Sequence, residues 1–290
     1  MAYDGLERLG VERDAGVAFV TIDSPPMNLL GGELFGEIDA CTRELEADDS
    51  VRVAVFRSAD PDFFIAHGDV EGIVQMPERE RPEPVELPFT HTALERLRKM
   101  PKVTIAQVEG FARGGGSEFA LACDMRFAAL GKAVFGQPEV ALGILPGAGG
   151  TYRLTRLVGR ARACEIVLGC DDFSAEEAER LGWVNRALPP GTVGAYVERL
   201  ARRIAGFPAK AIAQAKAVMD AAGEDVAAGL LAEQAAFERL MAGGSERVPR
   251  MRRFLDLGCQ TLPGERTIGA DCVKLGADRS DPAGAGEGVS

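Results

Sequence analysis

The chain has 290 residues, with 44 acidic and 33 basic side chains, a formal net charge of −11 and 46% hydrophobic residues. This is the composition of a globular protein that can bury a large core in one or two domains. The negative charge argues against nucleic acids and anionic membranes as partners. A polyanionic ligand must therefore be held by local basic residues or by backbone donors.

The N-terminal sequence and the cysteines indicate where the protein is located and whether it binds a metal. The first residues, MAYDGLERLG, lack the basic-then-apolar layout of a signal peptide, and no apolar run reaches the length of a membrane span. We therefore expect a cytoplasmic protein. The six cysteines have no metal-ligand spacing, so we expect core thiols and no metal site.

Strand and helix patterns alternate through the first hundred residues. Residues 16–23 and 51–57 have the apolar patterns of strands, and residues 33–46 carry apolar side chains at helical spacing. A charged, proline-rich segment, residues 75–88, predicts a mobile loop. The next segment predicts an amphipathic helix with Phe89, Leu94, Leu97 and Met100 facing inward. Such alternation favours an α/β fold.

A glycine-rich turn follows the next predicted strand, residues 103–108. Gly114, Gly115 and Gly116 precede a short helical pattern over residues 117–122. Glycines between a strand and a helix let a ligand approach the backbone, where unpaired N–H groups and the helix dipole point outward. This geometry suits an anion, or an oxygen that becomes negatively charged during a reaction.

Two carboxylates accompany this turn. Glu118 lies one turn inside the predicted helix, and Glu139 follows a Gly-Gln-Pro turn. Beside a backbone anion hole, the two form an arrangement suited to acid–base catalysis. Each residue alone has a simpler explanation, since the helix dipole favours a carboxylate at the position of Glu118 and Glu139 fits a surface loop.

The C-terminal half turns from mixed patterns to helical ones. Short helices are predicted over 151–158 and 161–168, a capping box at Ser174–Glu177 begins another helix, and residues 183–188 resemble a last strand. Residues 197–204, 209–222 and 226–241 are helical and rich in alanine. We expect an α/β core over residues 1–200, a helical subdomain over 201–265 and a flexible tail over 266–290.

Three motifs in register resemble the enoyl-CoA hydratase (crotonase) family. They are FFIAHGDV, GGGSEFALACD and FGQPEVALGILPGAGGTYRL, and the likeness extends from about Gly16 to Pro208. The resemblance implies a crotonase-like spiral of ββα units with a C-terminal α-helical subdomain. In that family the C-terminal helices cover the active site and build a trimer, so we expect a homotrimer or homohexamer. The loop at 75–88 would lie beside the acyl pocket, as a specificity segment or as a plain connector.

The resemblance also assigns roles to residues. The backbone N–H groups of Gly68 and Gly115 would form the oxyanion hole. Glu139 would handle the C2 proton, and Glu118 would hold and activate water. Coenzyme A, which is part of the acyl-CoA thioester substrate and not a separate cofactor, would be bound by Met27, Ala66, Gly68, Asp69, Val70, Glu71 and Gly115.

The chain departs from the family pattern at two places. Many members carry a basic residue shortly before the position of Asn28, where this chain has Pro25-Pro26-Met27. We therefore hypothesise that arginines further on contact the CoA phosphates, namely Arg247, Arg250, Arg252 and Arg253. Members more often have a small residue at the position of His67, to which we assign no catalytic role.

The expected activity is hydration of the 2,3 double bond of a 2-enoyl-CoA thioester through an oxyanion-stabilised enolate. The main alternative is 3-enoyl to 2-enoyl isomerisation, which often uses a single carboxylate at the position of Glu139. Hydrolase, decarboxylase and dehalogenase reactions remain open, as does a non-catalytic CoA-ester-binding subunit. A nicotinamide enzyme fits less well because the spaced glycine fingerprint is missing. A serine nucleophile at Ser117 lacks a suitably placed histidine.

Overall fold

The computed structural model describes residues 3–79, 83–221, 226–241 and 247–275. The larger of its two sheets has the strand order β1-β2-β3-β5-β7-β10. Strands β1 and β2 form an antiparallel hairpin, and every later pairing in this sheet is parallel. The strands are β1 (Leu9–Asp14), β2 (Val17–Ile22), β3 (Val53–Ser58), β5 (Val103–Val108), β7 (Met125–Ala129) and β10 (Arg186–Leu188).

The smaller sheet has the order β4-β6-β8-β9 and consists of β4 (Phe63–Ile65), β6 (Phe111–Arg113), β8 (Val134–Gly136) and β9 (Asp172–Ser174). The pairs β3–β4, β5–β6 and β7–β8 each place their first strand in the larger sheet and their second in the smaller sheet. One or two helices follow each pair. The chain therefore winds as a spiral of ββα units, which confirms the predicted α/β fold class.

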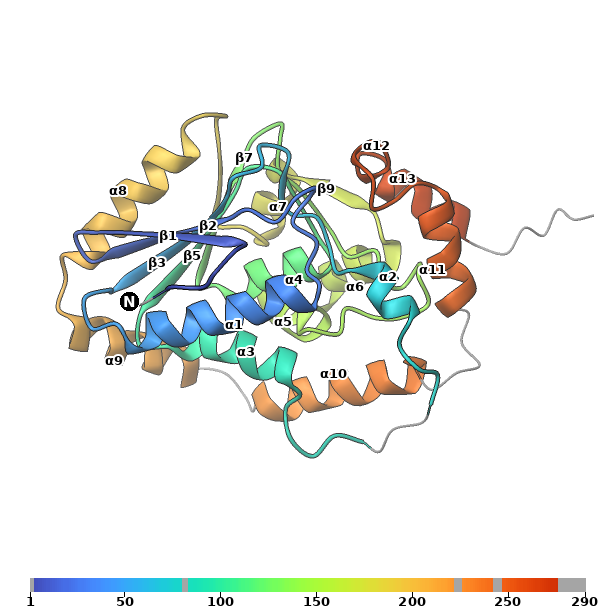
Figure 1. Cartoon of the computed structure of the whole chain (residues 1–290), viewed down its shortest axis with the longest axis horizontal. Coiled ribbons are helices and arrows are strands. Elements are labelled where there is room, and N and C mark those ends of the chain that lie inside the picture. The colour runs from blue at the N-terminus through green and yellow to red at the C-terminus, as the bar shows by residue number, and fades with distance from the viewer. Residues whose placement is uncertain (1–2, 80–82, 222–225, 242–246, 276–290) are drawn as a thin grey trace, which may run out of the picture.

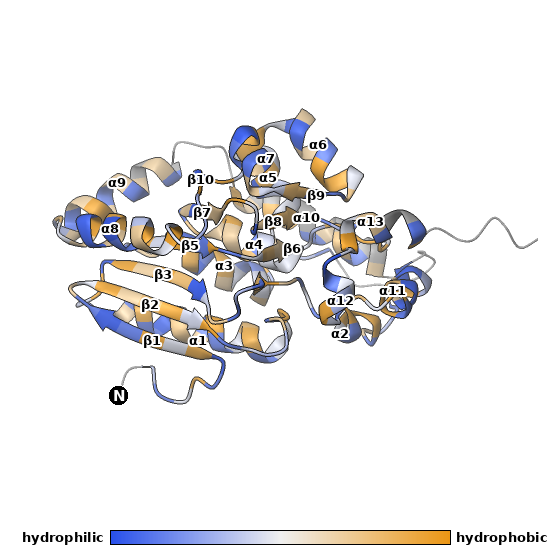
Figure 2. Cartoon of the chain, turned by 90° about the horizontal axis from the view of Figure 1, so that it is seen from above, coloured by the Kyte–Doolittle hydropathy of each residue, from blue (hydrophilic) through white to orange (hydrophobic). Residues whose placement is uncertain are grey.

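Helices cover the larger sheet on both faces (Figures 1 and 2). Through the core the helices are α1 (Gly32–Ala47), α2 (Val70–Val74), α3 (Phe89–Lys99), α4 (Gly115–Ala122), α5 (Gly150–Val158), α6 (Arg160–Gly169), α7 (Ala175–Leu181) and α8 (Val193–Ala205). Helix α8 packs on one face against Val17 and Val53, while α1, α3 and α4 share the core of the other face with Val20 and Phe56. Burial of both faces explains why β2 and β3 are almost continuously apolar.

The C-terminal region is helical, as predicted. It contains α9 (Ala209–Ala221), α10 (Val226–Met241), α11 (Arg247–Asp256), α12 (Leu262–Glu265), α13 (Ile268–Cys272) and a short 3₁₀ helix, Val273–Leu275. Helix α10 contacts α5, and α11 contacts α2 (Figure 1). A Cβ atom added at Gly147 would lie 2.4 Å from the ring of Phe237, so α10 covers the loop before α5. The predicted division at residues 200 and 265 stays a prediction. Within the predicted tail, residues 268–275 are helical and bury Ile268 and Leu275, and residues 276–290 lie outside the described part.

Most local predictions are confirmed, and the exceptions have physical reasons. Ser174 and Glu177 form both hydrogen bonds of the capping box. Cys41 and Cys123 are core thiols, and burial raises the pKa of each to about 12. The inward placement of Phe89 is wrong: it begins α3, is 55% exposed and lies edge-on to the ring of Phe35.

Three further findings concern the predicted loops and the sheet edge. Strand β1 was not predicted, because it is an edge strand in which only Leu9 is buried. The described parts of the 75–88 segment, residues 75–79 and 83–88, contain neither helix nor strand. None of the helices in the described ranges has the length and apolar character needed to cross a membrane.

Candidate active site

Two backbone amides meet where the loop after β4 approaches the first turn of α4. Leu30 holds the loop, since its N–H donates to the His67 carbonyl at 2.8 Å and its own carbonyl accepts from Asp69 at 3.3 Å. A Cβ atom built on Gly115 would lie 3.3 Å from the Gly68 nitrogen. Among the described residues, neither the Gly68 nor the Gly115 N–H has a backbone acceptor. The structure thus brings the two predicted oxyanion donors together.

Gly114 and Gly116 make this approach possible. Gly114 caps α4 with φ 45° and ψ −124°, a backbone conformation that residues with a Cβ atom rarely adopt. A Cβ atom there would lie 2.6 Å from Oε1 of Glu139. At Gly116 a Cβ atom would lie only 2.0 Å from the Ile65 carbonyl oxygen. The glycines therefore let the helix N-terminus pack directly against β4 and the Glu139 carboxylate.

Glu118 points from α4 toward the start of α5. It is 4% exposed, and its Oε1 accepts hydrogen bonds from the backbone N–H groups of Ala148 at 2.7 Å and Gly150 at 2.8 Å. A Cβ atom at Gly150 would lie 2.8 Å from the same oxygen. Two main-chain donors at the N-terminus of α5 thus fix the orientation of this carboxylate.

Glu139 approaches the first turn of α4 at its cap residue, Gly114. It follows β8, is 8% exposed, and its carbonyl accepts from the N–H groups of Leu142 and Ile144 at 3.0 Å each. A Cβ atom built on Gly114, the residue before Gly115, would meet the Glu139 carboxylate at 2.6 Å and Cβ of His67, the residue before Gly68, at 3.5 Å. Two buried carboxylates can transfer protons here, while the two amides donate hydrogen bonds to an oxygen that gains negative charge.

A buried ion pair that was not predicted from the sequence supports the loop before α5, which holds the Glu118 carboxylate. Arg153 of α5 donates from Nη1 to the Ala148 carbonyl and from Nη2 to Oε1 of Glu95, each at 2.8 Å. Glu95 in α3 is 4% exposed. Since the N–H of Ala148 donates to Glu118, the Arg153–Glu95 pair anchors the segment that orients the candidate catalytic carboxylate.

The Arg153–Glu95 pair also predicts that the folded protein becomes less stable in acid. Burial raises the pKa of Glu95, but hydrogen bonds from Arg98 and Arg153 outweigh it and hold the pKa at about 2, below the usual 4.5. A lowered pKa contributes stability that is complete above pH 4.5 and is lost as the pH falls toward 2. We expect Glu95→Gln to flatten the pH dependence of unfolding free energy in this window, measured by urea denaturation. Glu176→Gln, at an exposed position of α7, is the control and should leave the dependence unchanged.

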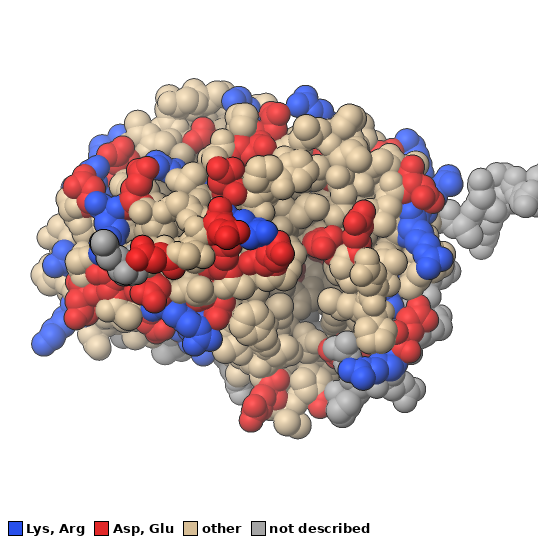
Figure 3. Space-filling view, in the orientation of Figure 1, with Lys and Arg blue, Asp and Glu red and all other residues tan. Residues whose placement is uncertain are grey.

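The predicted CoA-binding residues differ in their exposure. Met27, Ala66 and Val70 are at most 4% exposed, and the Met27 carbonyl accepts from the Ala66 N–H at 3.2 Å. Asp69 is half-buried and accepts a 3.2 Å bond from the Gln260 side chain. Glu71, in the first turn of α2, is exposed. In the space-filling view the surface is hollowed between the regions of α1 and α2, beside this loop (Figure 3).

The arginines hypothesised to contact phosphates lie in α11. Arg247 is fully buried and donates to the Ile73 carbonyl at 3.1 Å, and Arg250 donates to the Ala141 carbonyl. Arg252 and Arg253 are exposed. Basic side chains gather at the end of the molecule that carries α11 (Figure 3). The hypothesis therefore fits Arg252 and Arg253 and does not fit Arg247.

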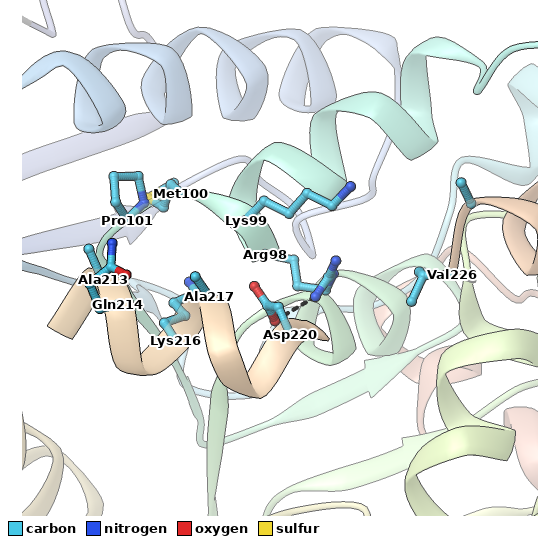
Figure 4. A pocket seen from close by; sticks show the side chains of 11 residues that line it. Arg98, Lys99, Met100, Pro101, Ala213, Gln214, Lys216, Ala217, Asp220 and Val226 are labelled. Atoms are coloured by element: carbon cyan, nitrogen blue, oxygen red, sulfur yellow. Dashed lines mark hydrogen bonds and ion pairs between the residues drawn. The ribbon is translucent and has the colours of Figure 1, made fainter. Parts of the chain in front are cut away.

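A separate groove of about 580 Å³ lies between α3 and α9 (Figure 4). Arg98, Lys99 and Lys216 line it, and Arg98 pairs with Asp220 at 2.6 Å. None of the predicted site residues lines this groove. Within the described ranges, no group of three or more His, Cys, Asp or Glu side chains could hold a metal ion.

A ββα spiral with paired amides and two buried carboxylates at one loop cluster defines the class, enzymes of the crotonase fold. The sequence profile of the enoyl-CoA hydratase/isomerase family matches residues 12–254. The chain belongs to this family.

Individual relatives agree with the profile. A short-chain-enoyl-CoA hydratase of Clostridium acetobutylicum is 36% identical over 200 residues, covering 69% of this chain and 76% of the relative. A crotonyl-CoA hydratase of Syntrophomonas wolfei is 36% identical over 205 residues, covering 70% of this chain and 76% of the relative. A crystal structure of an enoyl-CoA hydratase family protein from Streptomyces avermitilis superposes with a TM-score of 0.84 at 39% identity, covering 93% of this chain and 99% of that one.

Proposed function

We propose that the protein is an enoyl-CoA hydratase that adds water across the 2,3 double bond of a 2-enoyl-CoA thioester. One observation carries the proposal: the Gly68 and Gly115 amides lie together at the first turn of α4, the helix that carries the buried Glu118 and whose cap, Gly114, contacts the buried Glu139. Among the family's reactions, an oxyanion hole with two carboxylates best fits hydration, because hydration must both activate a water molecule and transfer a proton to carbon.

The backbone amides would stabilise the enolate. When water attacks C3 of a conjugated thioester, negative charge develops on the thioester oxygen. The Gly68 and Gly115 N–H groups would donate to that oxygen, and removing one such donor typically costs about 10²–10³ in rate. Because Gly115 begins α4, the helix dipole adds to the same stabilisation.

The two carboxylates would divide the proton transfers. Glu118, whose Oε1 is fixed by Ala148 and Gly150, would hold the attacking water and accept its proton. Glu139, whose carboxylate lies against Gly114, would deliver a proton to C2. Isomerisation needs only one such group, so the buried and oriented second carboxylate favours hydration over isomerisation.

The names of the two relatives support a short acyl chain, because one is a short-chain-enoyl-CoA hydratase and the other a crotonyl-CoA hydratase. We further propose that CoA is the only nucleotide group required, as part of the substrate. Assembly into a homotrimer or homohexamer and a cytoplasmic location stay predictions.

A hydration assay tests the proposal directly. We expect the purified protein to convert crotonyl-CoA to 3-hydroxybutyryl-CoA, followed by the loss of absorbance of the conjugated thioester. Product analysis by chromatography distinguishes hydration from isomerisation. Isomerisation of a 3-enoyl-CoA without hydration of any 2-enoyl-CoA would refute the proposal, and tight binding of CoA esters without turnover would favour a binding subunit.

A further inference from the structure

One carboxylate from the C-terminal region, Glu265, lies against both segments that carry the candidate oxyanion amides. Glu265 ends α12 and is fully buried. Its Oε1 lies 2.7 Å from Nε2 of His67, the residue directly before Gly68. Its backbone carbonyl accepts a 2.6 Å hydrogen bond from Nη1 of Arg113, which lies two residues before Gly115. A single residue thus joins the two halves of the amide pair.

His67 in turn fixes the backbone at Gly68. Its ring is buried, and Nδ1 lies 2.7 Å from the Gly68 carbonyl oxygen, which can only accept, so Nδ1 donates. The Leu30 N–H holds the His67 carbonyl at 2.8 Å. Both peptide groups that flank the Gly68 Cα are therefore held, and with them the direction of the Gly68 N–H.

Further contacts fix the carboxylate of Glu265. Oε1 also accepts from the Gln260 N–H at 2.7 Å, and Nη1 of Arg113 lies 3.8 Å from Oε2. Arg113 is itself oriented by a bidentate pair with Asp172, at 2.6 and 2.7 Å. Glu265, His67, Arg113 and Asp172 thus form one hydrogen-bonded cluster in which each member orients the next.

The geometry points to Glu265 as a positioning residue for the oxyanion hole, acting through His67 and Arg113. This inference rests on the proposed function, which assigns the Gly68 and Gly115 amides to the enolate oxygen. Glu265 itself touches no substrate. It sets the spacing of two amide-bearing segments, and a misplacement of 1 Å in such a site can cost about a hundredfold in rate.

The test compares Glu265→Gln with Asp271→Asn. Asp271 in α13 bonds to Thr267 and Lys274, outside this cluster, and receives the same carboxylate-to-amide change. We expect Glu265→Gln to lower kcat for crotonyl-CoA about ten- to a hundredfold, with KM changed less than about threefold, because the amides bind the enolate more strongly than the ground-state carbonyl. Asp271→Asn should alter neither constant.

A second readout needs binding alone. A dimethylaminocinnamoyl-CoA absorbs further to the red when its thioester carbonyl is polarised, so the shift on binding reports the amide pair without turnover. We expect a smaller red shift with Glu265→Gln and an unchanged shift with Asp271→Asn. His67→Ala, which leaves Gln260 and Arg113 on Glu265, should reduce the shift as well and gives the test a second variant if Glu265→Gln does not fold.

The outcomes separate this inference from the proposed function. A wild-type protein that shifts the chromophore but does not hydrate crotonyl-CoA would refute the hydratase proposal, and the spectral comparison of variants would still decide the role of Glu265. Full red shift and full kcat in folded Glu265→Gln, or in His67→Ala, would overturn the positioning role. So would a variant in which only KM rises.

Discussion

Glu139→Gln should lower kcat for crotonyl-CoA hydration by about 10²–10⁴-fold, the usual contribution of one general acid or base. The amide keeps the shape of the side chain but cannot exchange a proton with C2. The change is nearly isosteric, and the carbonyl of residue 139 still accepts from Leu142 and Ile144. We therefore expect folding and substrate KM to change little. Initial rates over a range of crotonyl-CoA concentrations measure both constants.

Glu118→Gln provides the comparison within the site. Its Oε1 accepts from Ala148 and Gly150, so one amide orientation preserves these bonds and removes only the charge that activates water. Glu165→Gln, at an exposed position of α6, is the control and should retain wild-type rates. A protein in which neither Glu118→Gln nor Glu139→Gln reduces turnover would contradict the assignment of both carboxylates.

Isotope exchange can separate the two roles. If Glu139 moves the C2 proton, Glu139→Gln should abolish exchange of the C2 hydrogen of a saturated acyl-CoA with deuterated water, followed by mass spectrometry. Glu118→Gln should retain part of that exchange, because no water needs to be activated. Equal loss of exchange in both variants would mean that the carboxylates act on one proton as a unit.

Local patterns predicted most of the elements and indicated Glu118 and Glu139, because each depends on neighbours in the chain, whereas the family resemblance assigned the oxyanion and CoA-binding residues. The triple glycine predicted the start of α4, and the structure shows why: Gly114 and Gly116 each lie too close to another segment for a Cβ atom. The helix pattern at 89–100 identified α3 but placed Phe89 wrongly. Periodicity assigns a face, and the first residue of a helix can lie beyond the core that this face covers.

The contacts that support the site could not be predicted in the same way. Glu265 meets His67 across 198 residues of sequence, and Arg153 meets Glu95 across 58. Nothing in the local sequence of either carboxylate distinguishes it from a charge on a solvated helix face. Only the folded spiral of ββα units, with the C-terminal helices packed on it, brings Glu265 to the segment of His67 and Gly68 and brings Glu95 to Arg153 beside the loop before α5. The sequence gives no reason to assign His67 a role, and the positioning role inferred above depends on its buried contact with Glu265.

Gly114→Ala should be at least as damaging as loss of a carboxylate, because it affects both Glu139 and the amide of Gly115. The new Cβ atom would lie 2.6 Å from Oε1 of Glu139 and 3.5 Å from Cβ of His67. The carboxylate must move, and a displacement of about 1 Å typically costs about a hundredfold in rate. The φ of 45° adds backbone strain of about 1–3 kcal/mol. We expect kcat to fall more than about a hundredfold and unfolding to require less urea.

Gly131→Ala separates the two causes. Gly131 also has positive φ, at 68°, but a Cβ atom there would meet nothing within 4 Å. Its alanine variant should therefore lose stability through strain alone and keep its kcat. If the two variants have similar urea midpoints of unfolding and similar kcat values, backbone strain accounts for the whole loss of activity in Gly114→Ala. A large fall in kcat only at position 114 would mean that the missing side chain is what lets Glu139 and the helix N-terminus share one site.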